Sequence, residues 1–305
     1  MSDNTFSDFL DTARNAVRDN FVAVTEKEIN YGHQFTVTEN SRKATLNIYN
    51  GKKGRKFVFS GDVAVVEKLR NLLRLDENAS TTAAESAKKY SGNLWAGSDE
   101  SGKGDFFGSL VVAAVVVDKD SAAKIVEAGI KDCKMLSDRK ILEFEAVIKE
   151  LAVDYSVLEL LPQFYNKRYE EVKTNGGKLN QLLSSGHINA LSQVLERNHL
   201  CEYALIDQFS VSQETVRILQ SRFSRCKIMQ HPRAEKNIAV AAASVLARAK
   251  FLQTMNLLAE QADTTSLPKG GGSAATEAAG VIAEKYGKEA LRNFVKLHFV
   301  NYSRI

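Results

Sequence analysis

The sequence predicts a small α+β domain followed by a larger α/β domain, and three observations carry this prediction. The chain has 305 residues, which favours two domains over one. Residues 76–93 contain no large aliphatic side chain and no apolar period, so we expect a linker there. Before this stretch short alternating runs follow one helix, whereas after it apolar runs interleave with long helical patterns. The predicted domains are therefore 1–75 and 94–305.

Composition narrows the class of protein. The chain is 44% hydrophobic and 26% charged, which excludes disordered and fibrous architectures. A net charge of +4 is too small for a purely electrostatic nucleic-acid binder. Three scattered cysteines argue against a disulfide framework and a structural zinc site. The longest apolar run, Leu110–Val117, is too short to cross a membrane, and the N-terminal residues do not read as a signal peptide. We expect a cytoplasmic protein that binds no membrane.

The first domain reads as a short sheet backed by helices. Residues Ala44–Tyr49 alternate between apolar and polar side chains, which is typical of a half-buried strand. The expected elements are a helix over Phe6–Phe21, strands over Gln34–Thr38, Ala44–Tyr49 and Phe57–Phe59, a hairpin loop over Asn50–Gly54, and a helix over Asp62–Leu75.

A basic segment lies within this first domain. It holds six basic residues and no acid: Arg42, Lys43, Lys52, Lys53, Arg55 and Lys56. Tyr49 lies between them on the polar face of its strand, and an aromatic among cations suits a nucleic-acid backbone. The alternative is a solvated hairpin whose lysines prevent edge pairing. Tyr49, Lys52, Lys53 and Arg55 are our candidate substrate contacts.

The second domain has an α/β pattern. Its expected strands are Leu94–Gly97, Leu110–Val117, Val153–Leu160, Tyr203–Ile206 and Lys227–Met229. Its expected helices are Asp138–Leu151, Leu179–Glu196, Val211–Leu219, Ile238–Leu258, Ala275–Tyr286 and Lys288–Leu297. The run Leu110–Val117 lacks polar alternation, so we expect a strand covered on both faces.

Two adjacent acids follow the first strand of this domain. Asp99 and Glu100 precede a Gly-Lys-Gly turn, and a carboxylate at the end of a core strand is tolerated when it is paired or binds metal. Residues 97–103 also match the G-x-x-x-x-G-K pattern of a phosphate-binding loop. Gly104 stands where that loop needs Ser or Thr, and a strand follows rather than a helix. We therefore reject the nucleoside-triphosphatase interpretation.

A carboxylate metal site is the favoured interpretation. Two-metal phosphodiester hydrolysis needs a cluster of acids around a pair of ions, and Mg²⁺ prefers oxygen ligands. Asp207 ends an apolar run, and Glu235 lies just before the Ala-rich helix. The alternatives are a helix N-cap for Asp207 and a helix-dipole residue for Glu235. We expect His187 to be packed or hydrogen-bonded rather than catalytic.

Several segments together resemble one family. The run DESGKGDFFG at 99–108 resembles the signature of ribonuclease HIII, a type 2 ribonuclease H. The first domain resembles that family's TBP-like substrate-binding domain. Five further segments resemble family motifs in the same order: Asp132–Asp138, Leu205–Phe209, Ala234–Ser244, Leu267–Gly270 and His298–Asn301.

The resemblance implies a fold, an activity and a site. The fold is an RNase H-like mixed five-stranded sheet with flanking helices, beside the α+β TBP-like domain. The activity is endonucleolytic cleavage of RNA in RNA–DNA hybrids by a monomer, leaving 5′-phosphate and 3′-hydroxyl ends. Two Mg²⁺ ions, or Mn²⁺, would bind with the substrate. The implied metal ligands and catalytic residues are Asp99, Glu100, Asp207 and Glu235. The implied substrate contacts are Ser101, Gly102, Lys103 and Gly104. Lys134 and Lys178 are further candidate phosphate contacts, and the alternative for each is a surface lysine.

Two positions depart from the family pattern and leave alternatives open. Ser109 stands where proline is common, and Cys133 stands where serine is common. Neither change removes a predicted metal ligand, so we expect effects on rate and affinity. The remaining alternatives are a ribonuclease HII-like enzyme acting at single ribonucleotides in DNA and a catalytically silent hybrid-binding protein.

Overall fold

The computed structural model describes residues 6–51, 54–73, 93–130 and 136–305. The chain divides into two compact units, Met1–Glu85 and Ser86–Ile305. This boundary falls inside the stretch predicted as a linker, but residues 74–92 lie outside the described ranges, so the linker remains a prediction. Other predictions also fall outside these ranges: Lys52, Lys53, the end of the helix expected to Leu75, and the first part of the motif Asp132–Asp138 with Cys133 and Lys134.

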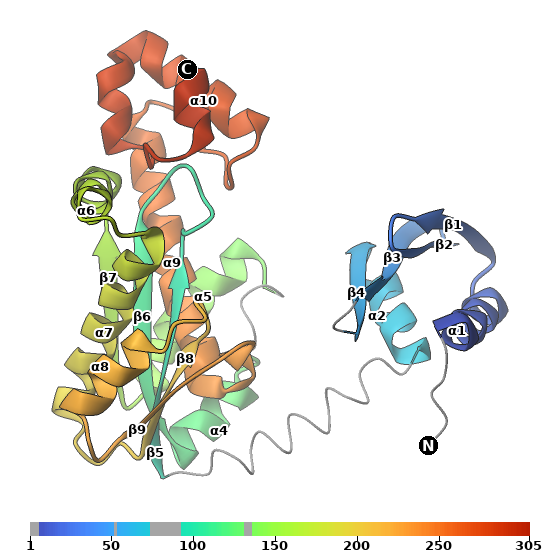
Figure 1. The fold of residues 1–305 in the computed structure, drawn as a ribbon, viewed down its shortest axis with the longest axis horizontal. Helices are drawn as coiled ribbons and strands as arrows, with labels where there is room; N and C mark the ends of the chain where they lie inside the picture. The colour runs from blue at the N-terminus through green and yellow to red at the C-terminus, as the bar shows by residue number, and fades with distance from the viewer. Residues whose placement is uncertain (1–5, 52–53, 74–92, 131–135) are drawn as a thin grey trace. The chain divides into compact units, whose positions relative to one another are not determined.

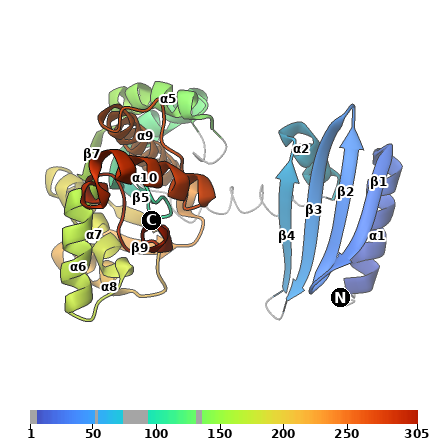
Figure 2. The same cartoon turned by 90° about the horizontal axis from the view of Figure 1, so that it is seen from above.

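The first unit is a four-stranded antiparallel sheet with two helices, drawn in blue in Figure 2. Its core is the apolar side chains that one face of the sheet and the two helices share, including Phe35, Leu46 and Leu69. Its elements are α1 (Phe6–Asn20), β1 (Ala23–Ile29), β2 (Gly32–Glu39), β3 (Arg42–Gly51), β4 (Gly54–Gly61) and α2 (Val63–Leu72), with strand order β1-β2-β3-β4.

Strand β3 follows the predicted alternation, whereas no strand was predicted over the residues of β1. In β3 the side chains of Ala44, Leu46 and Ile48 are buried, so the intervening polar residues and Tyr49 lie on the opposite face. The sequence of β1 is AVTEKEI, and its side chains are either exposed or half-buried, with none fully buried. An edge strand with three charged residues carries little apolar alternation, so the pattern that reveals β3 is weak in β1.

The second unit is built on a mixed five-stranded sheet in the order β7-β6-β5-β8-β9. β6 pairs antiparallel with β5 and with β7, whereas β8 pairs parallel with β5 and with β9. The central strand β5 therefore ends at the same sheet edge as β8 and β9. The strands are β5 (Leu94–Ser101), β6 (Leu110–Asp118), β7 (Asp154–Leu160), β8 (Tyr203–Asp207) and β9 (Lys227–His231).

Helices cover both faces of this sheet (Figure 1). The core on one face joins the sheet to α9 and α5, and the core on the other joins it to α7 and α8. The helices are α4 (Lys119–Glu127), α5 (Asp138–Leu151), α6 (Pro162–Thr174), α7 (Leu179–Arg197), α8 (Glu214–Arg222), α9 (Ile238–Gln261) and α10 (Ser273–Tyr286). Three 3-10 helices add η2 (Ala234–Lys236), η3 (Lys288–Asn293) and η4 (Val300–Arg304).

Strand β6 shows why this unit needs two helical layers. Val111, Val115 and Val117 belong to the core under α9, whereas Val112 and Val116 belong to the core under α7. Since successive side chains of a strand point to opposite faces, an uninterrupted apolar run requires cover on both. The prediction of a doubly covered strand is confirmed.

Helix α9 is the longest helix among the described residues and is rich in apolar side chains. Within the described residues it is the one helix long and apolar enough to cross a membrane, yet 78% of that stretch is buried inside the protein. Its side chains form much of the core beside β5 and β6. This burial accounts for its apolar composition without a membrane.

Two differences from the predicted elements matter for the site. Helices α4 and α6 were not predicted, although Pro162 at the start of α6 is a typical helix-opening residue. The predicted helix over Lys288–Leu297 is wrong, because η3 ends at Asn293. Beyond it the backbone pairs with the loop after β5: Gly108 N donates to Phe294 O at 3.1 Å, and Lys296 N donates to Phe106 O at 2.8 Å.

Candidate active site

Three of the four predicted acids meet at one edge of the sheet. Asp99 and Glu100 lie near the end of β5, and Asp207 is the last residue of β8. The two strands are parallel, with Ser98 in register with Ile206. The next residue of each strand, Asp99 and Asp207, therefore lies at the same level of adjacent strands. The parallel pairing turns two acids far apart in sequence into neighbours.

Asp99 is the most perturbed of these acids. Burial, together with the nearby charges of Glu100 and Asp207, raises its pKa to about 8. Its Oδ1 accepts a hydrogen bond from Glu100 N at 2.7 Å, and the side chain also bonds to Ser244 of α9. These bonds do not offset the repulsion. A cation placed among the three carboxylates would relieve it.

Glu100 is shifted in the opposite direction. Burial alone would raise its pKa, but a hydrogen bond from His187 and the charges of His187 and Lys103 outweigh burial and hold the pKa below its usual value. His187 Nε2 lies 3.1 Å from Oε2, and Lys103 Nζ lies 3.7 Å from Oε1. Glu100 is thus a charged carboxylate with one oxygen held by the protein and the other facing a lysine.

The chain segment carrying Glu235 is tied to the same edge. Asp207 Oδ1 accepts a hydrogen bond from Ala234 N at 2.9 Å, so Glu235 follows a backbone group anchored on β8. Asp207 does not cap the following helix, because α8 begins at Glu214 and Gln213 is its N-cap. The alternative assigned to Asp207 from sequence is therefore wrong.

The donor set fits a hard divalent cation. The converging side chains offer carboxylate oxygens, the ligands that Mg²⁺ and Mn²⁺ prefer. Among the residues that the structure describes, however, no three acids, histidines or cysteines are arranged to hold one ion. Lys103 instead presents its positive charge to Glu100, where a cation would be expected. The four-ligand assignment therefore remains a prediction.

Two glycines have different roles in the loop after β5: Gly102 is required by its backbone conformation and packing, whereas Gly104 borders open space. Gly102 has φ of +87°, and a Cβ there would lie 2.1 Å from Ser109 O, so no other residue fits without distortion. A Cβ at Gly104 would meet nothing within 4 Å. Protein packing therefore does not require glycine at 104, and its absent side chain leaves the loop accessible to a ligand beside Ser101 and Lys103.

Comparison with known proteins identifies the family. The family model described as Ribonuclease HII matches residues 96–302, more than half of the chain. The chain belongs to the ribonuclease HII family.

Individual relatives within this family point to ribonuclease HIII. The chain is 36% identical to Ribonuclease HIII of Protochlamydia amoebophila (strain UWE25), over 67% of this chain and 65% of that protein. It is 37% identical to Ribonuclease HIII of Chlamydia pneumoniae, over 68% of this chain and 69% of that protein. The match thus spans just under two thirds of the first relative's length.

A solved structure extends the likeness to both units. Bst-RNase HIII in complex with Mn²⁺ is 27% identical, with a TM-score of 0.64 covering 95% of this chain and 94% of that one. The expected RNase H-like fold with its N-terminal α+β unit is confirmed.

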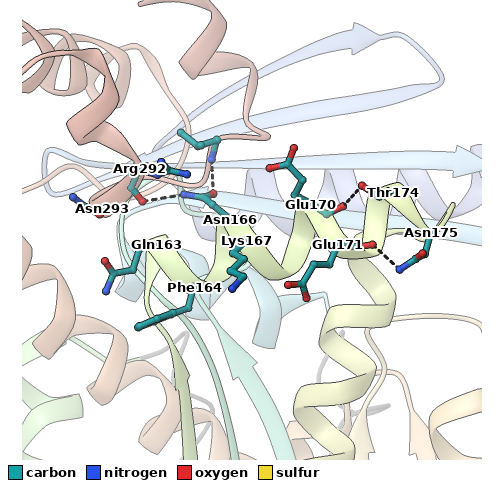
Figure 3. A pocket seen from close by; sticks show the side chains of 11 residues that line it. Gln163, Phe164, Asn166, Lys167, Glu170, Glu171, Thr174, Asn175, Arg292 and Asn293 are labelled. Carbon is teal, nitrogen blue, oxygen red and sulfur yellow. Dashed lines mark hydrogen bonds between the residues drawn. The ribbon is translucent and has the colours of Figure 1, made fainter.

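In this ribonuclease HII family member, the loop after β5 (residues 102–108, the glycine loop) is held in place by the segment around Lys296. Lys296 is fully buried, and its Nζ donates to Asp105 O at 2.9 Å and to Gly108 O at 2.7 Å. Asn166 of α6 in turn fixes the segment around Lys296, donating to Val295 O and accepting from Leu297 N, both at 2.9 Å. The same amide donates to Arg292 O at 3.0 Å, as Figure 3 shows. No sequence pattern predicts this role, because the acceptors are backbone oxygens that any residue supplies.

The remaining predicted substrate contacts lie in both units, and the two that the structure describes in the first unit lie on opposite faces of its sheet. Lys178 is exposed and lines a hollow of about 300 Å³ together with Phe209, which follows Asp207 closely. In the first unit Tyr49 lies on the outer face of the sheet. Arg55 lies on the helix side, since it shares a face with Phe57, and its guanidinium stacks 4.6 Å above the ring of Phe9. Tyr49 and Arg55 therefore do not form one binding face.

Proposed function

We propose that this chain is an endoribonuclease that hydrolyses the RNA strand of RNA–DNA hybrids, leaving 5′-phosphate and 3′-hydroxyl ends. The observation that carries the proposal is the convergence of Asp99, Glu100 and Asp207 beside the glycine loop, within a member of the ribonuclease HII family. A hybrid-binding protein without catalysis does not need a buried group of repelling carboxylates. This arrangement therefore favours an enzyme over a silent binder.

Two Mg²⁺ or Mn²⁺ ions are the proposed cofactors. Asp99, Glu100, Asp207 and Glu235 would hold them, with substrate phosphate completing the coordination. When bound, such ions supply activation of a water and stabilisation of the leaving 3′-oxygen. The relative Bst-RNase HIII was solved with Mn²⁺, which supports a divalent metal.

The chain's own residues would orient the substrate and select RNA. Gly102 and Gly104 allow the backbone to approach a sugar closely, and the 2′-hydroxyl separates RNA from DNA. Lys103 belongs to the same loop and lies beside Glu100, so its ammonium is within reach of a phosphate brought to the carboxylates. Lys178 would contact the backbone farther along the hollow that it lines.

The first unit would add a sequence-independent grip on the hybrid. Lys43 is exposed on β3, on the same face as Tyr49. An aromatic side chain and a cation on one sheet face suit a nucleic-acid backbone. We propose further that the protein acts as a cytoplasmic monomer and removes RNA from DNA during replication and repair.

The test is cleavage of a labelled RNA–DNA hybrid by the full chain with Mg²⁺ or Mn²⁺. Asp99→Asn and Asp207→Asn should fold and bind the hybrid, yet lose at least about 1,000-fold in rate, because each removes a charge that the metal requires. Retained cleavage by Asp99→Asn would overturn the assignment of the site. A DNA duplex with one ribonucleotide serves as the second substrate. Cleavage of that duplex alone would favour the ribonuclease HII-like alternative.

A further inference from the structure

A buried histidine contacts Glu100 in the acid cluster. His187 of α7 is fully buried, and none of the family motifs identified in the sequence includes it. Its Nε2 lies 3.1 Å from Glu100 Oε2, and its Nδ1 lies 2.7 Å from Ser98 Oγ. The ring also stacks on Phe209, with a centroid distance of 4.8 Å and an interplanar angle of 1°. Both nitrogens and one ring face are therefore engaged.

The chemistry of the partners determines which atom donates in the contact between His187 and Glu100. A carboxylate only accepts, so the proton between His187 and Glu100 belongs to Nε2. Ser98 Oγ also lies 2.8 Å from Ala113 O, to which it can donate. Ser98 then either accepts from a protonated Nδ1 or donates to a bare one. In both arrangements Nε2–H donates to Glu100 Oε2.

The imidazole ring of His187 is held by close packing of α7 on β6 and by residues of β5 and of the segment after β8. Helix α7 comes so close to β6 that a Cβ at Gly186 would lie 2.7 Å from the side chain of Val112. Ser98 belongs to β5, and Phe209 follows β8. The ring is thus fixed by the two strands that carry Asp99, Glu100 and Asp207. A ring that only filled space would not need two polar partners in register.

We propose that His187 is a positioning residue for the metal site: by holding Oε2 of Glu100, it leaves Oε1 as the single oxygen that faces the cation. This inference rests on the proposed function only in taking Glu100 as a ligand. Oε1 is also the oxygen beside Lys103, consistent with its being the free one. A histidine or carboxylate partner that orients a ligand typically changes metal affinity 10- to 100-fold.

Two amide substitutions separate positioning from packing. In His187→Gln the amide nitrogen can reach the place of Nε2 and still donate to Glu100. In His187→Asn the shorter amide can reach Ser98 but not Glu100. Both variants lose the stacking on Phe209 and the ring volume, so a structural role would be damaged by both.

The measurement is calorimetric titration of the full chain with Mn²⁺, without nucleic acid, alongside thermal unfolding. We expect His187→Asn to weaken Mn²⁺ binding at least about 10-fold and His187→Gln to stay within about 3-fold of the parent chain. Equal affinities in all three proteins, or equal losses in both variants, would overturn the proposal.

A third variant guards against misfolding of His187→Asn. Ser98→Ala keeps the ring but removes the hydroxyl beside Nδ1, and it should also weaken Mn²⁺ binding. An unchanged affinity in Ser98→Ala, together with a misfolded His187→Asn, would contradict the proposal. Because the readout is metal binding, a chain that binds Mn²⁺ but cuts no hybrid would overturn the proposed function and not this inference.

Discussion

The two halves of the site are held by different forces. The glycine loop, residues 102–108, is fixed through its backbone: Phe106 N donates to Gly270 O, and Nζ of Lys296 donates to the carbonyl oxygens of Asp105 and Gly108. In the acid half, the charges of Glu100 and Asp207 disfavour the ionised form of Asp99. The loop is therefore held by the protein's own donors and acceptors, whereas the proposed cation would have to offset the repulsion among the acids.

The largest expected effect comes from removing the central support of the loop. Lys296→Met leaves the carbonyls of Asp105 and Gly108 without their donor, and each buried acceptor that loses its partner costs about 1–3 kcal/mol. We expect a loss of about 2–4 kcal/mol in the free energy of unfolding, measured by urea denaturation. Lys285→Met, at an exposed ion pair, is the control and should leave the free energy of unfolding nearly unchanged.

The same substitution has a pH signature. Burial lowers the pKa of Lys296 to about 7 from its ordinary value of 10.5. Between these values the unfolded chain binds a proton at this amine that the folded chain releases, so the stability of the parent chain rises with pH. Lys296→Met removes this rise, and the stability gap between the two proteins should widen from pH 7 to pH 9. A gap that narrows would contradict the assignment.

An effect of intermediate size is expected for Lys103, which belongs to the glycine loop and faces Glu100 of the acid half. Lys103→Met removes the cation that faces Glu100 Oε1, so Mn²⁺ binding without nucleic acid should tighten by about 3-fold. Hybrid binding should weaken by about tenfold, because a phosphate or ribose contact is lost. The two changes have opposite signs, which calorimetry and a hybrid-binding titration check separately. A weakening of both would show that Lys103 supports the acids rather than competing with the metal.

The smallest effect concerns the departure at Ser109. Its Oγ is fully buried and has no hydrogen-bond partner in the described part of the chain. Ser109→Ala should therefore raise the free energy of unfolding by about 1 kcal/mol, seen as a melting temperature higher by about 2–4 °C. Ser98→Ala is the matched control and should lower it, since Ser98 Oγ is bonded. A destabilised Ser109→Ala would mean that the loop depends on this hydroxyl.

The acids of the candidate site could be predicted from the sequence because they lie at the ends of apolar strands. Asp99, Glu100 and Asp207 could be found because ionised residues follow apolar runs, and the parallel pairing then brings them together. His187 is packed and hydrogen-bonded, as predicted, but its contact with Glu100 and the role of Lys296 could not be predicted. Their partners lie 87 to 191 residues away, and several of those partners are backbone oxygens that any residue supplies. The helix expected over Lys288–Leu297 failed for the same reason, because long-range pairing ended it early.

The bond between Lys296 and Gly108 has a consequence for the order of folding. It joins positions 188 residues apart, so closing it costs more chain entropy than a local contact and we expect it late in folding. The hairpin of β5 and β6, which carries Asp99 and Glu100, can form earlier because its strands are adjacent in the sequence. Asp207 joins these acids only when β8 pairs with β5, which is also a long-range pairing. We therefore expect the acid cluster and the support of the loop to be completed together, after the hairpin has formed.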